Sequence, residues 1–114
     1  MQVNLWKSPG HNLESQLLLL GGDVWEKKVS HTPLNCPNCK KNTLHIFFHT
    51  FGKQKRSAST WIWCSNCFVF VHLTMLNPPS WVNYLDNTEN LNVPYLNSIS
   101  DKIDEHVSEY LNSL

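Results

Sequence analysis

Four cysteines in two identical pairs constrain this chain more than any other feature. Each pair has the spacing Cys-x-x-Cys, and residues 40–63 separate the two pairs. A Cys-x-x-Cys turn presents two thiolates to one ion, with backbone N–H groups directed at the sulfurs, and two such turns complete a tetrahedral ligand set. The pattern therefore predicts one Zn²⁺ ion, held by the four cysteines of the chain: Cys36, Cys39, Cys64 and Cys67.

Other uses of four cysteines fit the sequence less well. Disulfides persist in oxidising compartments, whereas the chain has neither the pattern of a signal peptide nor the ~18 to 20 apolar residues of a membrane span. A thioredoxin-like redox pair needs a βαβ context, and iron–sulfur clusters use more crowded spacings. We therefore expect a cytoplasmic protein with reduced thiols. Four thiolates leave no open coordination position, so the metal is expected to be structural.

The residues around the cysteines predict β-strands. Apolar residues alternate over 43–51, a polar loop follows at 52–57, and strands are expected at 60–63 and 68–73. A cysteine turn, a hairpin, a second cysteine turn and a last strand make up a zinc ribbon, over about residues 31–76. In the first strand, one face is expected to carry Leu44, Ile46 and Phe48, and the other His45, Phe47 and His49.

The two ends of the chain differ in how clearly they predict helices. Residues 98–113 have one apolar face, and Ser98 with Asp101 forms a capping-box pattern at the start. That face is formed by Ile99, Ile103, Val107, Tyr110 and Leu114, with Leu111 beside it. Near the N-terminus, Leu17–Leu20 fits either a short helix capped by Asn12 or a buried strand, because so short a run has no decisive period.

Two further features of the N-terminal region favour a short element there. Gly21-Gly22 predicts a break, and residues 24–29 have strand character. With 114 residues, the chain has room for one domain, 1–114. We expect an α+β fold, in which an antiparallel zinc-ribbon sheet packs against a C-terminal helix.

Charge is balanced overall but divided along the chain. Nine basic and nine acidic residues cancel, so the total predicts neither a nucleic-acid nor a membrane partner. The segment from Lys27 to Arg56 carries only basic charges, whereas six acidic residues from Asp86 onward face a single Lys102. This division bears on the choice of partner rather than on the fold.

Catalytic motifs are absent from the sequence. There is no nucleophile elbow, no phosphate-binding glycine loop and no His-Glu-x-x-His motif, and the ribbon contains no carboxylate. His45 and His49 share a strand face but are too far apart to chelate one ion easily, so structural roles are expected. The sequence predicts a protein that is not an enzyme.

Two functions fit these features. In the first, the chain binds another protein: Trp61 and Trp63 point to the same face of a strand, where they form either core or an exposed aromatic anchor. Negative charge on the last helix would then meet a basic partner, through Asp101, Asp104, Glu105 and Glu109. The alternative is nucleic-acid binding by the loop residues Lys53, Lys55 and Arg56, with Lys40 and Lys41 beside the first cysteine turn.

Residues 34–44 and 61–67 carry a resemblance to known proteins. The runs Leu-Asn-Cys-Pro-Asn-Cys-Lys-Lys-Asn-Thr-Leu and Trp-Ile-Trp-Cys-Ser-Asn-Cys resemble zinc-ribbon proteins, over about residues 24–80. They are also similar to small bacterial zinc-ribbon immunity proteins, which neutralise a cognate polymorphic toxin. That resemblance implies a tight protein partner, such as a basic toxin domain, and no catalysis. Lys40 departs from the glycine that is common at its position in transcription-factor ribbons.

Overall fold

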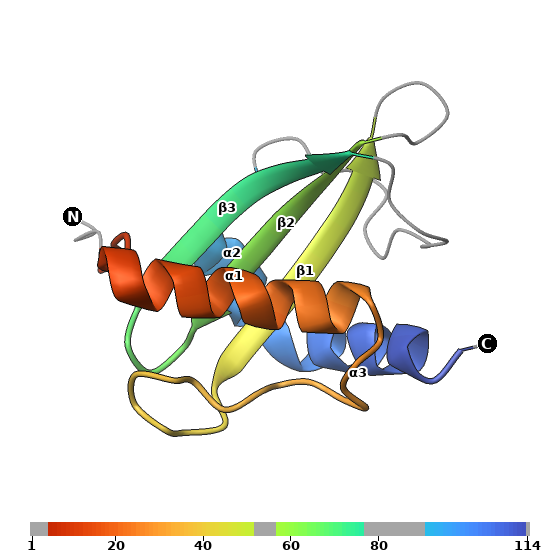
Figure 1. The fold of residues 1–114 in the computed structure, drawn as a ribbon, viewed down its shortest axis with the longest axis horizontal. Coiled ribbons are helices and arrows are strands. Elements are labelled where there is room, and N and C mark those ends of the chain that lie inside the picture. The colour runs from red at the N-terminus through yellow and green to blue at the C-terminus, as the bar shows by residue number, and fades with distance from the viewer. Residues whose placement is uncertain (1–4, 52–56, 77–90, 114) are drawn as a thin grey trace.

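Three antiparallel strands, hydrogen-bonded in the order β1-β2-β3, form the centre of the molecule (Figure 1). The computed structural model describes residues 5–51, 57–76 and 91–113. The elements follow in chain order as α1 (His11–Trp25), β1 (Leu44–Phe51), β2 (Ser57–Cys64), β3 (Val69–Leu76), α2 (Val93–Ser98) and α3 (Ser100–Leu111). The predicted α+β class is confirmed. β1 agrees with its expected run to within one residue, β2 extends beyond its run at both ends, and β3 begins one residue later and ends three residues later than expected.

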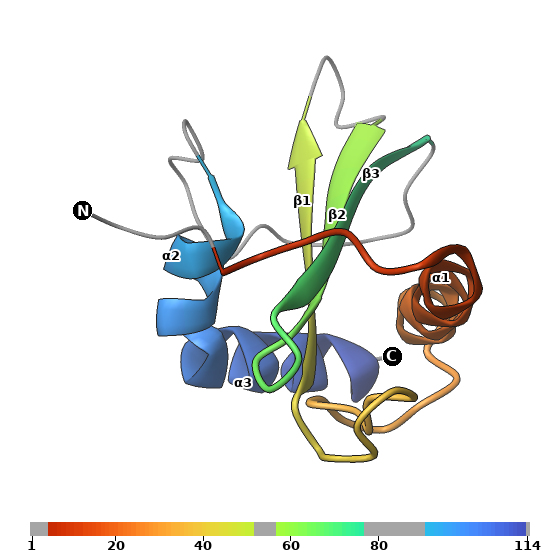
Figure 2. The same ribbon diagram turned by 90° about the vertical axis from the view of Figure 1, so that its left-hand side faces the viewer.

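Helices cover both faces of the sheet. Seen along the edge of the sheet, α1 lies on one side and α2 and α3 lie on the other (Figure 2). The C-terminal helix α3 packs against β1, as the sequence predicts. The molecule therefore has three layers, with the sheet as the middle one.

The alternation of strand residues explains why both faces are covered. Phe48 points toward α1, where its ring lies 4.3 Å from that of Trp25. Phe47 and Trp63 lie on the opposite face, the one covered by α2 and α3, and both are fully buried. Since successive residues of a strand point to opposite sides, strands with large apolar residues on both faces need a layer on each side.

The N-terminal helix is longer than the sequence predicts. α1 continues through Gly21 and Gly22, so the expected break is wrong, and so is the expected strand at 24–29, because Val24 and Trp25 lie in the helix. Asn12 is not the cap, since the helix begins after Gly10 without a side-chain cap. Burial of Leu17, Val24 and Trp25 against the sheet outweighs the low helix propensity of the glycines.

The predicted C-terminal helix begins two residues later than expected, at Ser100, and a separate short helix, α2, precedes it. Asn92 caps α2 by accepting a hydrogen bond from the Tyr95 N–H (2.9 Å), and Ser98 ends that helix. The Ser98 hydroxyl donates to the Tyr95 carbonyl (2.6 Å) and caps nothing, so the expected capping box does not form. The apolar face beyond it is confirmed where the structure describes it, since Ile103, Val107, Tyr110 and Leu111 are buried and Ile99 packs against the core.

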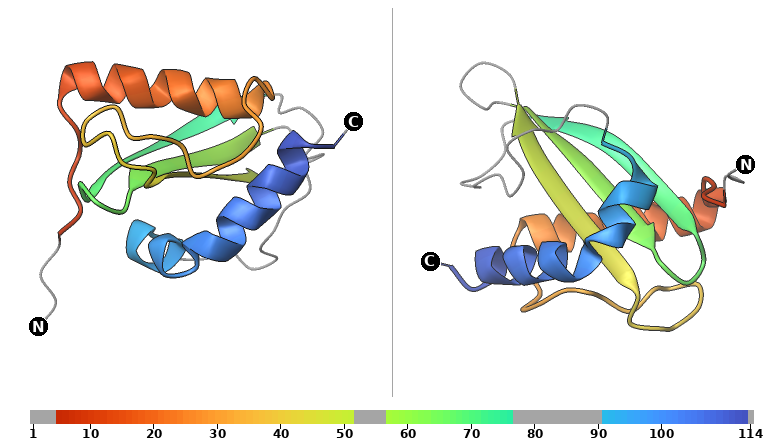
Figure 3. Two further views of the ribbon diagram at one scale, coloured as in Figure 1. Left: turned by 90° about the horizontal axis from the view of Figure 1, so that it is seen from below. Right: turned by 180° about the vertical axis from the view of Figure 1, so that it is seen from behind.

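The two helical layers meet around the free edge of β1. The Tyr110 hydroxyl of α3 donates to the Trp25 carbonyl at the end of α1 (2.7 Å), and the Lys27 ammonium lies 4.7 Å from the centre of the Tyr110 ring. Figure 3 shows α1 and α3 above and below the sheet. At the opposite edge, Lys7 pairs with Val69 in a short parallel bridge.

Within the described residues, no helix is long and apolar enough to cross a membrane.

Candidate metal centre

The two cysteine turns lie at the same end of the sheet. The first turn belongs to the loop before β1, and a bridge between Leu34 and Leu44 holds this loop against the start of the strand. The second turn connects β2 to β3. Because Leu44 pairs with Cys64, the antiparallel register brings the end of β2 beside the first turn.

The backbones of the two turns have the same geometry. In each turn the residue after the second cysteine donates its N–H to the carbonyl of the first cysteine, from Lys40 to Cys36 (2.8 Å) and from Phe68 to Cys64 (3.0 Å). Both donors adopt left-handed backbone angles, with φ of 64° at Lys40 and 59° at Phe68. The equal spacing of the two motifs therefore corresponds to two equivalent folded turns.

The four sulfurs converge on one point. All four ligand atoms lie within 4.8 Å of one another. The Cys36 and Cys67 sulfurs are 3.9 Å apart, and the Cys39 and Cys64 sulfurs are 3.8 Å apart. A disulfide needs about 2.05 Å, so the cysteines are free thiols. The four predicted ligands are thus brought together in an arrangement that a metal ion could occupy.

Hydrogen bonds to the sulfurs cross from one turn to the other. The Asn38 amide of the first turn donates to the Cys67 sulfur (3.3 Å), and the Asn66 side chain of the second turn hydrogen-bonds Cys39. Within the second turn, the Cys67 N–H points at the Cys64 sulfur (3.3 Å). Such donors stabilise thiolates and orient them, which is how groups around a metal support its ligands.

The pKa values of three thiols are displaced by this environment. Burial raises the pKa of Cys67 to about 12, against the opposing effect of the Asn38 amide, and burial also raises the pKa of Cys36. Burial alone would raise the pKa of Cys39, but hydrogen bonds from the Lys41 N–H and the Asn66 side chain, among others, lower it to about 6. A cation at the centre of the four sulfurs would favour the thiolate form of each.

A polar relay beside the second cysteine turn was not expected from the sequence. The His45 Nδ1 atom lies 2.8 Å from the Asp104 Oδ2 atom, and the His45 Nε2 atom lies 3.3 Å from the Ser65 hydroxyl. Asp104 comes from α3, which brings a carboxylate to the ribbon that the ribbon sequence itself lacks. This connectivity is that of a Ser-His-Asp triad. Ser65, however, donates two hydrogen bonds to the Thr43 carbonyl, one from its N–H (3.0 Å) and one from its hydroxyl (3.4 Å).

The structure places the predicted partner-binding acids in two environments. Asp101, Glu105 and Glu109 are exposed at successive turns of α3, and we call them the acidic stripe. Asp104 was expected to meet a basic partner with them, but it is not available to one: it is 7% exposed and bonded to His45. The physical reason is that position 104 borders the apolar face of α3, where it meets a buried hydrogen-bond donor on β1.

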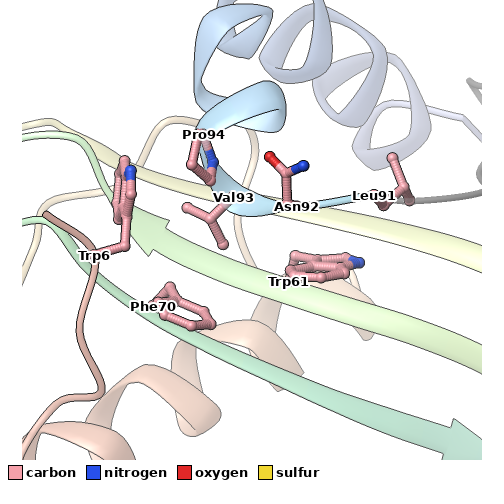
Figure 4. A pocket seen from close by; sticks show the side chains of 7 residues that line it. All are labelled: Trp6, Trp61, Phe70, Leu91, Asn92, Val93 and Pro94. Atoms are coloured by element: carbon pink, nitrogen blue, oxygen red, sulfur yellow. The ribbon is translucent and has the colours of Figure 1, made fainter. Parts of the chain in front are cut away.

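The two predicted tryptophans share a face but form no open surface. Trp63 is fully buried, and its indole N–H donates to the Asn97 amide oxygen of α2 (3.1 Å). Trp61 is 8% exposed and stacks on His72, with ring centres 3.6 Å apart. Trp61 also forms part of the wall of a hollow of about 390 Å³ that Trp6, Phe70 and the residues around Val93 complete (Figure 4). Their main role in the structure is therefore packing under α2.

Of the basic residues proposed for nucleic-acid binding, Lys40 and Lys41 are exposed beside the first turn. Lys53, Lys55 and Arg56 lie outside the described residues. No model of a known protein family matches the chain, and neither a curated protein nor a solved structure shows a significant match to it.

Proposed function

We propose that the four thiolates hold one structural Zn²⁺ ion. Zinc binds cysteine sulfur at about 2.3 Å in a tetrahedron, whose edges are then about 3.8 Å long. The Cys39–Cys64 and Cys36–Cys67 sulfur separations, 3.8 and 3.9 Å, match that edge, and this observation carries the proposal. An all-thiolate tetrahedron suits zinc or iron among the common metals, and paired Cys-x-x-Cys turns beside a hairpin are typical of zinc.

We further propose that the chain acts by binding another protein and catalyses no reaction. The acidic stripe supports this proposal, because three carboxylates occupy the outer face of α3, and Lys102 and His106 are the basic residues on that helix. A surface of one charge attracts partners of the opposite charge and raises their rate of association. The attachment of Ser65 to the Thr43 carbonyl favours a structural role for the relay.

The specific form of this proposal is an immunity protein that neutralises a basic toxin domain. It rests on the resemblance of the two cysteine segments to immunity proteins and on the sign of charge on α3. In such a complex the acidic stripe would lie against the toxin, and the metal would keep the sheet beneath α3 in place.

The experiment reverses the acidic stripe and measures the rate of association with a basic toxin domain encoded beside the gene of this chain. Changing Asp101, Glu105 and Glu109 to Lys should slow association at least tenfold at low salt, with a smaller effect at high salt. The matched control changes Glu14, Asp23 and Glu26 to Lys, which alters the net charge equally on and after α1. Zinc content and folding should be unchanged in both variants.

Other outcomes would decide against this proposal. Equal association rates for the two triple variants would show that α3 is not the interface. Retardation of a nucleic-acid duplex at low salt, lost when Lys53, Lys55 and Arg56 are replaced, would favour the alternative function. If toxicity in co-expressing cells is not reduced by the chain, the immunity form of the proposal is wrong.

A further inference from the structure

Asp104 is an unusual residue to find inside a small protein. The residue is 7% exposed, and only one of its oxygens has a hydrogen-bond partner among the described residues, since Oδ1 has none there. A buried carboxylate with an unpaired oxygen costs several kcal/mol relative to an apolar residue of the same shape. Its retention inside the fold therefore calls for an interaction that an apolar residue could not supply.

A series of hydrogen bonds connects Asp104 on α3 to the second cysteine turn. A carboxylate at 2.8 Å fixes a proton of His45 on Nδ1, and Nε2 then faces the Ser65 hydroxyl at 3.3 Å. Ser65 follows Cys64 directly, and its N–H donates to the Thr43 carbonyl. The hydroxyl of Thr43 in turn lies 3.1 Å from the Cys64 sulfur. Every link after Asp104 is therefore a hydrogen bond within the sheet end that carries the ligands.

We propose that Asp104 is a positioning residue for the metal centre, which acts through His45 and Ser65 to hold the second cysteine turn in ligand geometry. The inference rests on the proposal that the four thiolates hold a metal. Partners beyond the first ligands orient those ligands and typically change metal affinity about 10- to 100-fold when removed. Since Asp104 acts through two intermediates, we expect a change of several-fold.

The relay also connects metal binding to the acidic stripe, because Asp104 and the stripe belong to the same helix. Coupling between two binding events is reciprocal. If the bound metal raises the affinity of α3 for a partner by some factor, the bound partner should raise the affinity for the metal by the same factor. Loss of metal would loosen the packing of α3 on the sheet, and the acidic stripe would then no longer be held in place for the partner. The relay thus makes partner binding depend on metal occupancy.

The test measures the rate at which zinc-loaded protein releases zinc to an excess of chromophoric chelator. Asp104→Asn keeps the shape but removes the charge of the carboxylate, and Ser65→Ala removes the hydroxyl at the other end of the relay. Each should accelerate release several-fold. Because the two act along one path, the double variant should be no faster than the faster single one. The control is Val24→Ala, which weakens the packing of α1 on the other face of the sheet, away from α3 and the relay, and should leave the release rate within about twofold of the wild type.

Three results would overturn the inference. The accelerations from Asp104→Asn and Ser65→Ala could multiply, the Val24→Ala variant could release zinc as fast as Asp104→Asn, or Ser65→Ala could release it at the wild-type rate. If Asp104→Asn fails to fold, His45→Gln takes its place, because it removes the imidazole that connects Asp104 to Ser65 and should also accelerate release several-fold. A wild-type chain that binds no zinc would refute the proposed metal site itself, whereas these three results refute only the relay.

Discussion

Lys40 and Phe68 follow the two cysteine pairs, and both adopt a left-handed backbone that side chains disfavour. An L-residue other than glycine loses about 1–2 kcal/mol in this region, because Cβ approaches a carbonyl oxygen. The Cys-x-x-Cys turns require it, since the N–H of each residue must return to the carbonyl of the first cysteine. Glycine is therefore suited to the position for a physical reason, which explains why zinc ribbons often carry it there.

Replacing Lys40 with glycine should stabilise the zinc-loaded protein. Relief of the left-handed strain exceeds the loss of the exposed hydrogen bond from the Lys40 ammonium to the Pro37 carbonyl, so we expect a gain of about 0.5–1 kcal/mol in unfolding free energy. Urea denaturation measures it. Lys41→Gly is the control, because φ at Lys41 is not positive, and it should destabilise. A loss of stability in Lys40→Gly would show that the turn is unstrained.

The ligands could be read from the sequence, whereas the relay could not. Cysteine spacing encodes a local turn, and two turns of equal spacing need only one hairpin to meet. Asp104 is separated from His45 by more than half of the chain, and its position on the border of an amphipathic helix is compatible with either exposure or burial. No local pattern distinguishes a carboxylate that faces water from one that meets a buried imidazole.

Among the elements, α1 shows how tertiary packing overrides local preference. Two adjacent glycines lower the stability of an isolated helix by about 1 kcal/mol each. Gly21 lies directly over β2, where a Cβ atom would come within 2.7 Å of the Ile62 Cδ1 atom. The glycine that suggests a break in the sequence is thus the residue that allows the helix to approach the sheet. The strands were predictable because the alternation of apolar residues along each one reflects which side chains the fold buries.

The two glycines should respond differently to alanine. A Cβ on Gly22 meets nothing within 4 Å, so Gly22→Ala should stabilise the protein by up to about 1 kcal/mol through helix propensity alone. Gly21→Ala gains the same propensity but crowds Ile62, and should be less stable than Gly22→Ala by about 1–3 kcal/mol. Adding Ile62→Val, which removes the Cδ1 atom, should recover part of that loss. Equal stabilities of the two alanine variants would contradict the close approach of α1.

For the molecule as a whole, the metal centre closes the end of the sheet from which two strands and the first loop emerge. Structural zinc binds with about 10–16 kcal/mol of apparent free energy at neutral pH. The total stability of a small domain is about 5–15 kcal/mol. A zinc ion in the proposed site would therefore contribute as much as the rest of the fold, and conditions that weaken its binding should destabilise the whole protein.

Acid should weaken zinc binding, and the affinity should fall more steeply below pH 6 than above it. At pH 7 the raised pKa values leave Cys36 and Cys67 protonated, whereas Cys39, with a pKa of about 6, is mainly thiolate. Zinc must displace the protons from the first two, so its affinity should fall by at least about a hundredfold for each pH unit lost. Below pH 6 Cys39 also takes up a proton, and the slope should steepen by about another tenfold. Competition with a chelator between pH 5 and 8 measures both slopes, and an affinity independent of pH would contradict thiolate ligation.

Removing the metal at neutral pH should unfold the sheet end and, with it, the contacts of α3. Purified protein should contain about one zinc per chain, and excess chelator should abolish its cooperative thermal transition, because the binding energy is also folding energy. Cys64→Ser should behave like the stripped protein, since it leaves three ligands. Ser113→Ala serves as a matched control at an exposed serine and should keep both zinc and transition. Circular dichroism with metal analysis decides the matter: less than half an equivalent of zinc in protein that still unfolds cooperatively would refute the metal centre.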